Sequence, residues 1–311
     1  MISAADIAAA LGEARPDGRD VRTKCPRCGG PLALRDTKRG LMAKCWAGCD
    51  STDVYRELRR RKLLTGKRPV PLSPEEAAAA NVAAEHRARV NVARARDLWE
   101  QGQPIRGTAG DRYLRAGRGL DILSPYIGAD AEHALRFCSR CWHSPGIYRP
   151  AVLARIDHYA RGFIGVHVTF LAPDGYGTDE FYPGKAALDP VRKVIGACKG
   201  GAARLGTPSP SEWLIVGEGL ETTLSVMQAC ALPGWAALSA DGICSVELPP
   251  DARMVVIAAD HDKSGVGASA ARRAAARLIG EGRRARIYLP PRAGSDWNDV
   301  LLGKAPADAE G

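Results

Sequence analysis

The sequence predicts an α/β protein built from four consecutive parts. Three observations carry this prediction. Four cysteines cluster near the N-terminus, an Ala- and Arg-rich stretch follows them, and short apolar runs alternate with helical stretches toward the C-terminus. We expect a cysteine-rich module in residues 1–66, a helical connector in 67–103, a mixed α+β segment in 104–210, and a domain with a parallel sheet flanked by helices in 211–311.

The overall composition is that of an ordinary globular protein. Of the 311 residues, 45% are hydrophobic and 25% are charged. No apolar run is long enough to predict a membrane span, and the N-terminus lacks the basic and apolar regions of a secretory signal. We therefore expect a cytoplasmic protein without membrane contact, whose nine cysteines stay reduced.

Positive charge is concentrated at the N-terminal end. The formal net charge is +9, and residues 1–68 hold 16 Lys and Arg against 8 Asp and Glu, whereas the remainder holds 28 against 27. Such a density suits contact with a phosphate backbone. The alternative is a solvated basic surface without a specific partner.

The clustered cysteines have the spacing of a metal site. They stand as CPRC and CWAGC, sixteen residues apart, and comprise Cys25, Cys28, Cys45 and Cys49. Two close pairs separated by a hairpin-length spacer suit one structural Zn²⁺ in a zinc-ribbon-like module, and metal binding would supply folding free energy that so small a core lacks. The alternatives are unligated buried cysteines or a redox pair.

A second cysteine pair is less informative. Cys138 and Cys141 lie near His143, so a second metal is conceivable, but no further pair stands at a comparable distance. We interpret this stretch as a loop with incidental soft side chains.

The next two parts are predicted from turn signals and apolar patterning. Ser73 is placed to cap a helix whose first turn holds Pro74, and that helix either lies on a surface or folds back through Val90, Leu98 and Trp99. In the mixed segment, the runs 151–156 and 163–171 predict strands.

The C-terminal part reads as alternating strands and helices. Apolar runs at 213–217, 236–240, 253–259 and 284–290 predict buried strands, and 221–232 and 268–280 predict helices.

Four acids follow the ends of these predicted strands. They are Glu218, Asp260, Asp262 and Asp296. Because the carboxyl ends of parallel strands meet at one crevice, we expect these acids to converge there and to bind Mg²⁺ or Mn²⁺ for phosphoryl transfer. The alternative for Asp260 and Asp262 is helix capping. For Glu221 and Asp299 two roles stay open, contact with the metals or a place as first-turn acids favoured by the helix dipole.

These residues resemble a known family. The runs 216–226, 258–273 and 295–302 resemble the Toprim domain of primases, topoisomerases and some nucleases, and the cysteine module resembles the zinc-binding domain that precedes Toprim in phage and mobile-element primases. The resemblance implies a general acid/base or metal-binding role for Glu218, Mg²⁺ binding by Asp260 and Asp262, and a position near the metals for Asp296. Many primases carry an acid where this chain has Thr222.

The resemblance implies a function with two alternatives. A DNA primase would synthesise short primers on single-stranded DNA from nucleoside triphosphates during replication of a phage, plasmid or mobile element. Candidate nucleotide- and nucleic-acid-binding residues are Lys185, Arg192, Lys193 and Arg204. Because no G-x-x-x-x-G-K-[ST] loop is present, we expect a separate replicative helicase. The alternatives are a metal-dependent Toprim nuclease and a non-catalytic nucleic-acid-binding protein.

Overall fold

The computed structural model describes residues 3–37, 40–64, 73–122, 124, 127, 129–173, 184–262 and 265–304. The chain divides into two compact units, residues 1–82 and 83–311, and the division falls within one long helix. Among the described residues, no helix is both long and apolar enough to cross a bilayer.

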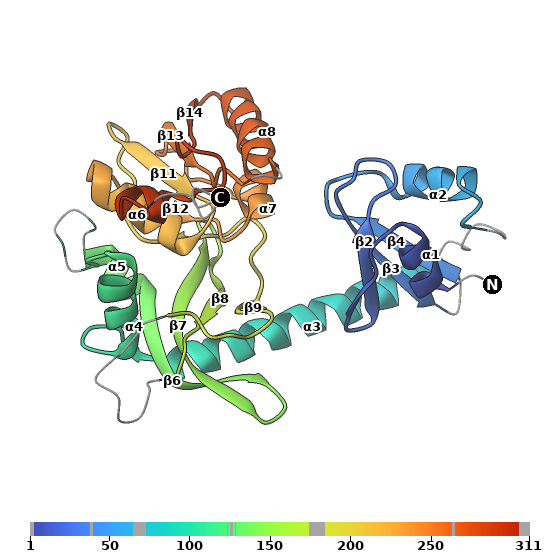
Figure 1. Ribbon diagram of the computed structural model, residues 1–311, viewed down its shortest axis with the longest axis horizontal. Coiled ribbons are helices and arrows are strands. Elements are labelled where there is room, and N and C mark those ends of the chain that lie inside the picture. The colour runs from blue at the N-terminus through green and yellow to red at the C-terminus, as the bar shows by residue number, and fades with distance from the viewer. Residues whose placement is uncertain are drawn as a thin grey trace, which may run out of the picture. The chain divides into compact units, whose positions relative to one another are not determined.

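The first unit is an antiparallel sheet packed against two short helices (Figure 1). Its elements are α1 (Ala4–Ala10), β1 (Arg15–Asp17), β2 (Asp20–Lys24), β3 (Pro31–Thr37), β4 (Gly40–Cys45) and α2 (Ser51–Arg60). Leu32 and Leu34 from β3 are fully buried against Ile7 of α1 and Leu58 of α2. The predicted hairpin is confirmed as β3 and β4, although Lys38 and Arg39 of its turn lie outside the described residues.

The helix α3 (Pro74–Gln101) begins where the sequence predicted. The Glu76 amide donates to Ser73 Oγ, and the Ser73 amide donates to the Glu76 carboxylate, which together form a capping box. Within the second unit, Ala95 and Trp99 are buried against a sheet, whereas Val90 is exposed. The helix therefore does fold back on its neighbour, but through its last two turns only.

The middle segment forms an antiparallel sheet in the order β5-β6-β7-β8-β9. The strands are β5 (Gln103–Pro104), β6 (Leu135–Ser144), β7 (Ile147–His158), β8 (Gly162–Phe170) and β9 (Arg192–Gly196), and the helices between β5 and β6 are α4 (Ala109–Arg112), a π-helical turn (Tyr113–Gly117) and α5 (Ala129–Ala134). The two strands predicted at 151–156 and 163–171 are confirmed as β7 and β8. The loop predicted around Cys138 and Cys141 is wrong, because both lie in β6 at a shift in its register with β7.

The last segment forms a second sheet, in the order β10-β12-β11-β13-β14. Its strands are β10 (Ala203–Arg204), β11 (Trp213–Gly217), β12 (Gly234–Ala236), β13 (Met254–Ala258) and β14 (Arg284–Tyr288), and all pairs are parallel except that of β10 with β12. The predicted parallel sheet is confirmed. The strand expected at 236–240 is displaced, because β12 ends at Ala236 and Ser239 caps the next helix.

Helices cover both faces of this second sheet (Figure 1). One face packs against α6 (Leu220–Cys230) and α9 (Trp297–Leu301), and the other packs against α7 (Ala240–Ser245) and α8 (Val266–Gly280). A single apolar cluster joins α6 to the middle sheet, since Leu220 and Leu224 share it with Phe137 and Val152. The two sheets therefore belong to one compact unit, and side chains from both can meet at a common site.

Candidate active site

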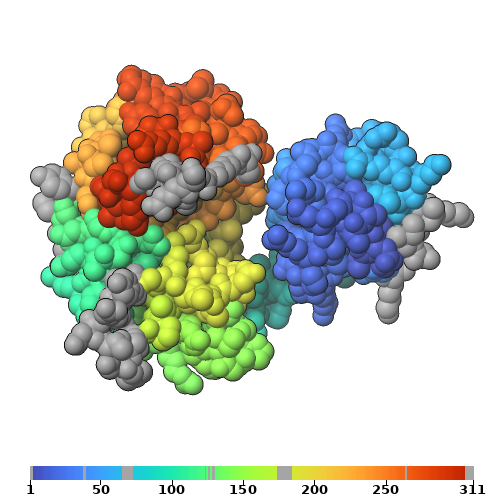
Figure 2. All heavy atoms as spheres, in the orientation of Figure 1, coloured from blue at the N-terminus to red at the C-terminus, as the bar shows by residue number. Residues whose placement is uncertain are grey.

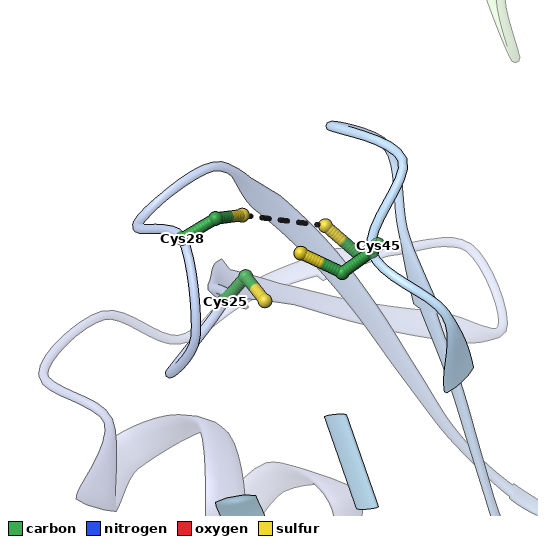
Figure 3. Close-up of side chains that lie close together, drawn as sticks. Cys25, Cys28 and Cys45 are labelled. Carbon is green, nitrogen blue, oxygen red and sulfur yellow. Dashed lines mark hydrogen bonds between the residues drawn. The ribbon is translucent and has the colours of Figure 1, made fainter. Parts of the chain in front are cut away.

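The four N-terminal cysteines lie together in the first unit. One ligand atom from each of Cys25, Cys28, Cys45 and Cys49 lies within 4.8 Å of the others, and the Sγ atoms of Cys28 and Cys45 are 3.6 Å apart (Figure 3). Four thiols this close fit a tetrahedral Zn²⁺ and no disulfide is formed among them. The structure therefore brings the four predicted cysteines together in a cluster that fits a structural Zn²⁺.

Glycines allow the two cysteine turns to approach each other. Gly29 and Gly48 have φ values of 74° and 90°, which side chains with a Cβ rarely adopt. A Cβ on Gly30 would stand 2.5 Å from the Cβ of Ala47, so the CPRC turn reaches the CWAGC turn only with glycine there. The second glycine of CPRCGG thus serves the geometry of the cluster.

The acids of the second unit lie at the carboxyl end of its parallel sheet. Glu218 follows β11, Asp260 follows β13, and the Glu218 amide donates to the carbonyl of Ala258 on the neighbouring strand. His261 forms a bridge with Ser295, which places the loop after β14 beside the Asp260–Asp262 turn. Sheet register therefore positions the predicted acids along one edge.

The Glu218 carboxylate is strongly perturbed. Its Oε2 atom is buried and accepts no hydrogen bond from any described residue. Burial, with the negative charges of Asp260 and Asp262, raises the pKa of Glu218 to about 7. A carboxyl group in this state is half ionised near neutral pH, so it can accept or donate a proton and can also gain a cation as a partner.

Gly267 in the first turn of α8 leaves room beside these acids. A Cβ there would stand 3.0 Å from Glu218 Oε2, 3.3 Å from Asp262 Oδ2 and only 2.6 Å from the backbone oxygen of Asp260. The absence of a side chain at this position keeps open a small space bordered by oxygen atoms from three acids. Oxygen ligands of this kind are those that Mg²⁺ and Mn²⁺ prefer.

The two aspartates after β13 have different surroundings. Asp260 accepts a hydrogen bond of 2.9 Å from Thr222 Oγ1, and burial raises the pKa of Asp260 while that hydrogen bond opposes the rise. Asp262 accepts from the amides of Val266 and Gly267 in the first turn of α8, whose N-cap residue is Gly265. These hydrogen bonds use both of its oxygens but leave its negative charge beside Glu218.

Asp296 caps the next helix. It accepts from the amide of Asp299, whose carboxylate accepts from the amide of Asp296, and this capping box begins α9. Asp299 thus has the first-turn role, one of the two that the sequence left open for it. Within the described parts of the chain, the cysteine cluster is the only group of three or more His, Cys, Asp or Glu side chains close enough to hold a metal ion. The acids are neighbours at one edge, but their carboxylate oxygens do not form such a group.

A buried ion cluster lies behind the acids, and the sequence did not predict it. Its centre is Glu221, whose Oε1 accepts from Tyr113 Oη at 2.8 Å and from Lys185 Nζ at 2.9 Å. Arg192 lies 3.9 Å from its other oxygen, and the Arg118 guanidinium donates to Tyr113 Oη. Glu221 does lie in the first turn of α6, one of the two roles left open for it, but its side chain is buried in this network of residues from three segments.

Charge in this cluster is unbalanced. Three cations, Arg118, Lys185 and Arg192, surround one carboxylate. Burial alone would raise the pKa of Glu221, but the charges of Lys185 and Arg192 outweigh burial and hold that pKa well below its usual range. The neighbouring His167 is buried, and burial lowers its pKa to about 4, so it adds no charge near neutral pH. The site therefore has net positive charge next to the acids.

The four basic residues selected from the sequence separate into two groups. Lys185 and Arg192 meet at Glu221. Lys193 donates to the carbonyl of His143 and stands over Trp142, and Arg204 stacks over Trp235. Only the first two lie at the acid edge.

The Toprim domain model matches residues 213–307. These residues form a Toprim domain. The match confirms the family predicted from Glu218 and the Asp260–Asp262 pair. A second family model, described as a domain of unknown function (DUF7146), matches residues 89–205, which include Tyr113, Lys185 and Arg192.

Solved structures of primases are similar to the chain at low identity. The Aquifex aeolicus primase (zinc binding and RNA polymerase domains) is 14% identical, with 97% of this chain and 80% of that chain covered and a TM-score of 0.42. The DnaG primase catalytic domain bound to ssDNA is 17% identical, with 71% and 79% covered and a TM-score of 0.43. A sequence search among curated proteins found no match.

Proposed function

We propose that this protein is a primase-like nucleotidyltransferase that synthesises short primers on single-stranded DNA during replication of a phage, plasmid or other mobile element, in the cytoplasm. The observation that carries the proposal is that two clusters of opposite charge lie near enough, inside one unit, for the charge of Arg192 to act on Glu218 and Asp260. Carboxylates of the Toprim sheet edge stand beside the cations around Glu221, and the family of the C-terminal domain is one that handles nucleic acids. Phosphoryl transfer needs side chains of both charges, because acidic side chains bind the metal ions and basic side chains bind the phosphates.

The acids would divide the chemical work. Asp260, Asp262 and Asp296 would hold Mg²⁺ or Mn²⁺ together with Glu218. The metal would supply charge neutralisation at the reacting phosphate. Burial and the charges of Asp260 and Asp262 raise the pKa of Glu218 to about 7 without a metal, and a bound cation would lower it. Glu218 would therefore serve either as a metal ligand or, where the aspartates alone hold the metal, as the base for the attacking 3′-hydroxyl.

The cations would bind the triphosphate. The side chain of Arg192 is 46% exposed, and its charge acts on both Glu218 and Asp260. A guanidinium can bind two phosphate oxygens at once. Lys185 is held by Glu221 behind it and would add a second positive charge.

The first unit would bind the template. One structural Zn²⁺ held by the four cysteines would stabilise it, and its basic surface would contact the phosphates of single-stranded DNA. Unwinding would come from a separate helicase, because the sequence contains no phosphate-binding loop of the motor type.

Two other functions use the same residues differently. A metal-dependent nuclease would use the acids to cleave DNA and would need no nucleoside triphosphate. A non-catalytic binding protein would need no carboxylate whose pKa is near 7.

The test is primer synthesis by the full chain on single-stranded DNA with nucleoside triphosphates and Mg²⁺ or Mn²⁺. Asp260→Asn and Asp262→Asn should each lower synthesis roughly a hundredfold or more, because a charged ligand at the reacting phosphate is lost. Asp241→Asn, an exposed acid in the first turn of α7, is the matched control and should leave synthesis unchanged. Near-normal synthesis by both site variants contradicts the proposal, and shortening of labelled DNA without triphosphates favours the nuclease.

A further inference from the structure

Two aromatic side chains are exposed on the hairpin formed by β6 and β7. Trp142 and Tyr148 are direct cross-strand partners, with 53% and 39% of their surface exposed. Trp235 and Tyr113 of the same unit are fully buried, and Trp142 is more exposed than the other exposed aromatics of the unit that the structure describes, Tyr159 and Tyr288. The hairpin tip projects from the rest of the sheet, and its light-green segment lies on the visible surface (Figures 1 and 2).

Cations surround these rings. The Arg140 guanidinium stands 4.3 Å from the centre of the Tyr148 ring, and Lys193 Nζ stands 5.4 Å from that of Trp142. From His133 to Ile156 the sequence contains four arginines and no Asp or Glu. An acid-free stretch of this length favours a negatively charged partner over a second copy of this chain or a neutral protein surface.

The exposed rings face the same side of the middle sheet as the acid edge. Cys141 packs in the cluster beneath α3, so Trp142, the next residue along the strand, points to the opposite side. On β9, Lys193 pairs with Val168 of that same cluster, so Arg192 also points to the opposite side. A hollow of about 490 Å³ lined by Arg112, Ser139 and Pro150, among others, adjoins the hairpin.

We propose that Trp142 and Tyr148 form a stacking platform for the bases of single-stranded nucleic acid, with the two cations that stand over these rings, Arg140 and Lys193, beside its phosphates. Flat exposed rings with adjacent cations are the elements that bind unpaired bases without regard to sequence. Duplex DNA cannot use the platform, because its bases stack on one another. The proposal concerns binding, so it stands or fails independently of catalysis at the acid edge.

The test measures binding of a fluorescent single-stranded oligonucleotide to the full chain by anisotropy. Trp142→Ala and Tyr148→Ala should each weaken binding about tenfold, equivalent to about 1.4 kcal/mol. Trp142→Phe should restore most of the affinity, because it keeps a stacking ring. Tyr288→Ala removes another exposed aromatic of the same unit and serves as the matched control.

A second oligonucleotide, which contains abasic sites, separates the contribution of base stacking to the affinity from that of charge. Wild-type protein and Trp142→Ala should bind it equally, since there is no base to stack. The slope of affinity against salt should stay the same in Trp142→Ala and become smaller in Arg140→Gln. The proposal is overturned if Trp142→Ala and Tyr148→Ala, with circular dichroism like that of the wild type, bind the normal strand with full affinity. It is also overturned if Trp142→Phe binds as weakly as Trp142→Ala. Asp260→Asn should bind the oligonucleotide with wild-type affinity. Failure of the primase proposal would therefore appear in the synthesis assay, whereas failure of the stacking proposal would appear as unchanged binding by the Trp142 and Tyr148 variants.

Discussion

Replacing Glu221 with Gln tests the buried ion cluster directly. Gln keeps the size of the side chain and can still accept from Tyr113, but it removes the one negative charge among three cations. Lys185 and Arg192 would then be left near each other without compensation. Removing one partner of a buried ion pair costs about 3–5 kcal/mol.

The expected loss lies at the lower end of that range. The Lys185 side chain retains 21% exposure and Arg192 retains 46%, so water can partly compensate both charges. We expect the free energy of unfolding of the second unit to fall by about 3 kcal/mol at pH 7. Glu281→Gln is the matched control, because Glu281 pairs with Arg277 and Arg283 at the surface, where such pairs contribute about 0–1 kcal/mol.

The loss should depend on pH with a definite sign. The pKa of Glu221 is lower in the folded protein than in the unfolded chain, so its stabilisation is complete above the ordinary carboxyl pKa and declines as pH falls below it. The difference between wild type and Glu221→Gln should therefore be constant from pH 7 to about pH 5 and then shrink by about 1.4 kcal/mol per pH unit.

Denaturant titration followed by tryptophan fluorescence measures this difference. Five of the six tryptophans lie in residues 83–311, so the signal reports mainly on the second unit. A loss under about 1 kcal/mol at pH 7 would refute the uncompensated-charge argument, since surface pairs reach that value. A loss that does not change between pH 5 and pH 3 would refute the assignment of a buried, ionised carboxylate.

Two further substitutions test the metal sites. Cys45→Ser should release the bound Zn²⁺ and unfold the first unit while the second keeps its transition, and full zinc retention by metal analysis would contradict the four-thiolate site. Gly267→Ala should lower primer synthesis at least about tenfold and destabilise the fold by about 1–3 kcal/mol, because its Cβ would meet Asp260 and Glu218. Gly280→Ala at the end of the same helix meets nothing within 4 Å and should leave synthesis intact, so equal effects of the two changes would refute the space argument.

The sequence predicted the parts of the fold that are decided by neighbouring residues, such as strand burial and helix capping. β11 has the bounds of its apolar run, and Ser73 begins α3, because strand burial and helix capping are decided by adjacent residues. β12 was misplaced because the strand is only three residues long and its Gly234 is selected by packing, since a Cβ there would stand 2.6 Å from Met227. The register shift in β6 is set by pairing with β7, which no single strand encodes.

In the candidate site, too, the sequence predicted what neighbouring residues decide and missed what the packing of distant segments decides. Glu218, Asp260 and Asp262 could be placed at one edge because parallel strands end together. The ion cluster could not, because Tyr113 and Glu221 are 108 positions apart and meet only when the middle sheet packs on the Toprim sheet. The one local signal was Glu221 itself, an acid inside the otherwise apolar and hydroxyl-bearing stretch of α6.

The electrostatics of the second unit favour an enzyme over a protein that only binds nucleic acid. Binding a phosphate backbone requires exposed cations, and Arg140 on the hairpin would supply one within a stretch of sequence that contains no Asp or Glu. The acid edge instead holds buried negative charges close together. Burial and the neighbouring like charges raise the pKa values of both Glu218 and Asp260, at a cost in stability. Neighbouring cations at Glu221 do not remove that cost, since Glu218 still has a pKa of about 7. A metal bound between the carboxylates and a triphosphate bound at Arg192 would offset both charge excesses at once. The arrangement thus predicts that metal and triphosphate bind cooperatively, which simple strand binding does not require.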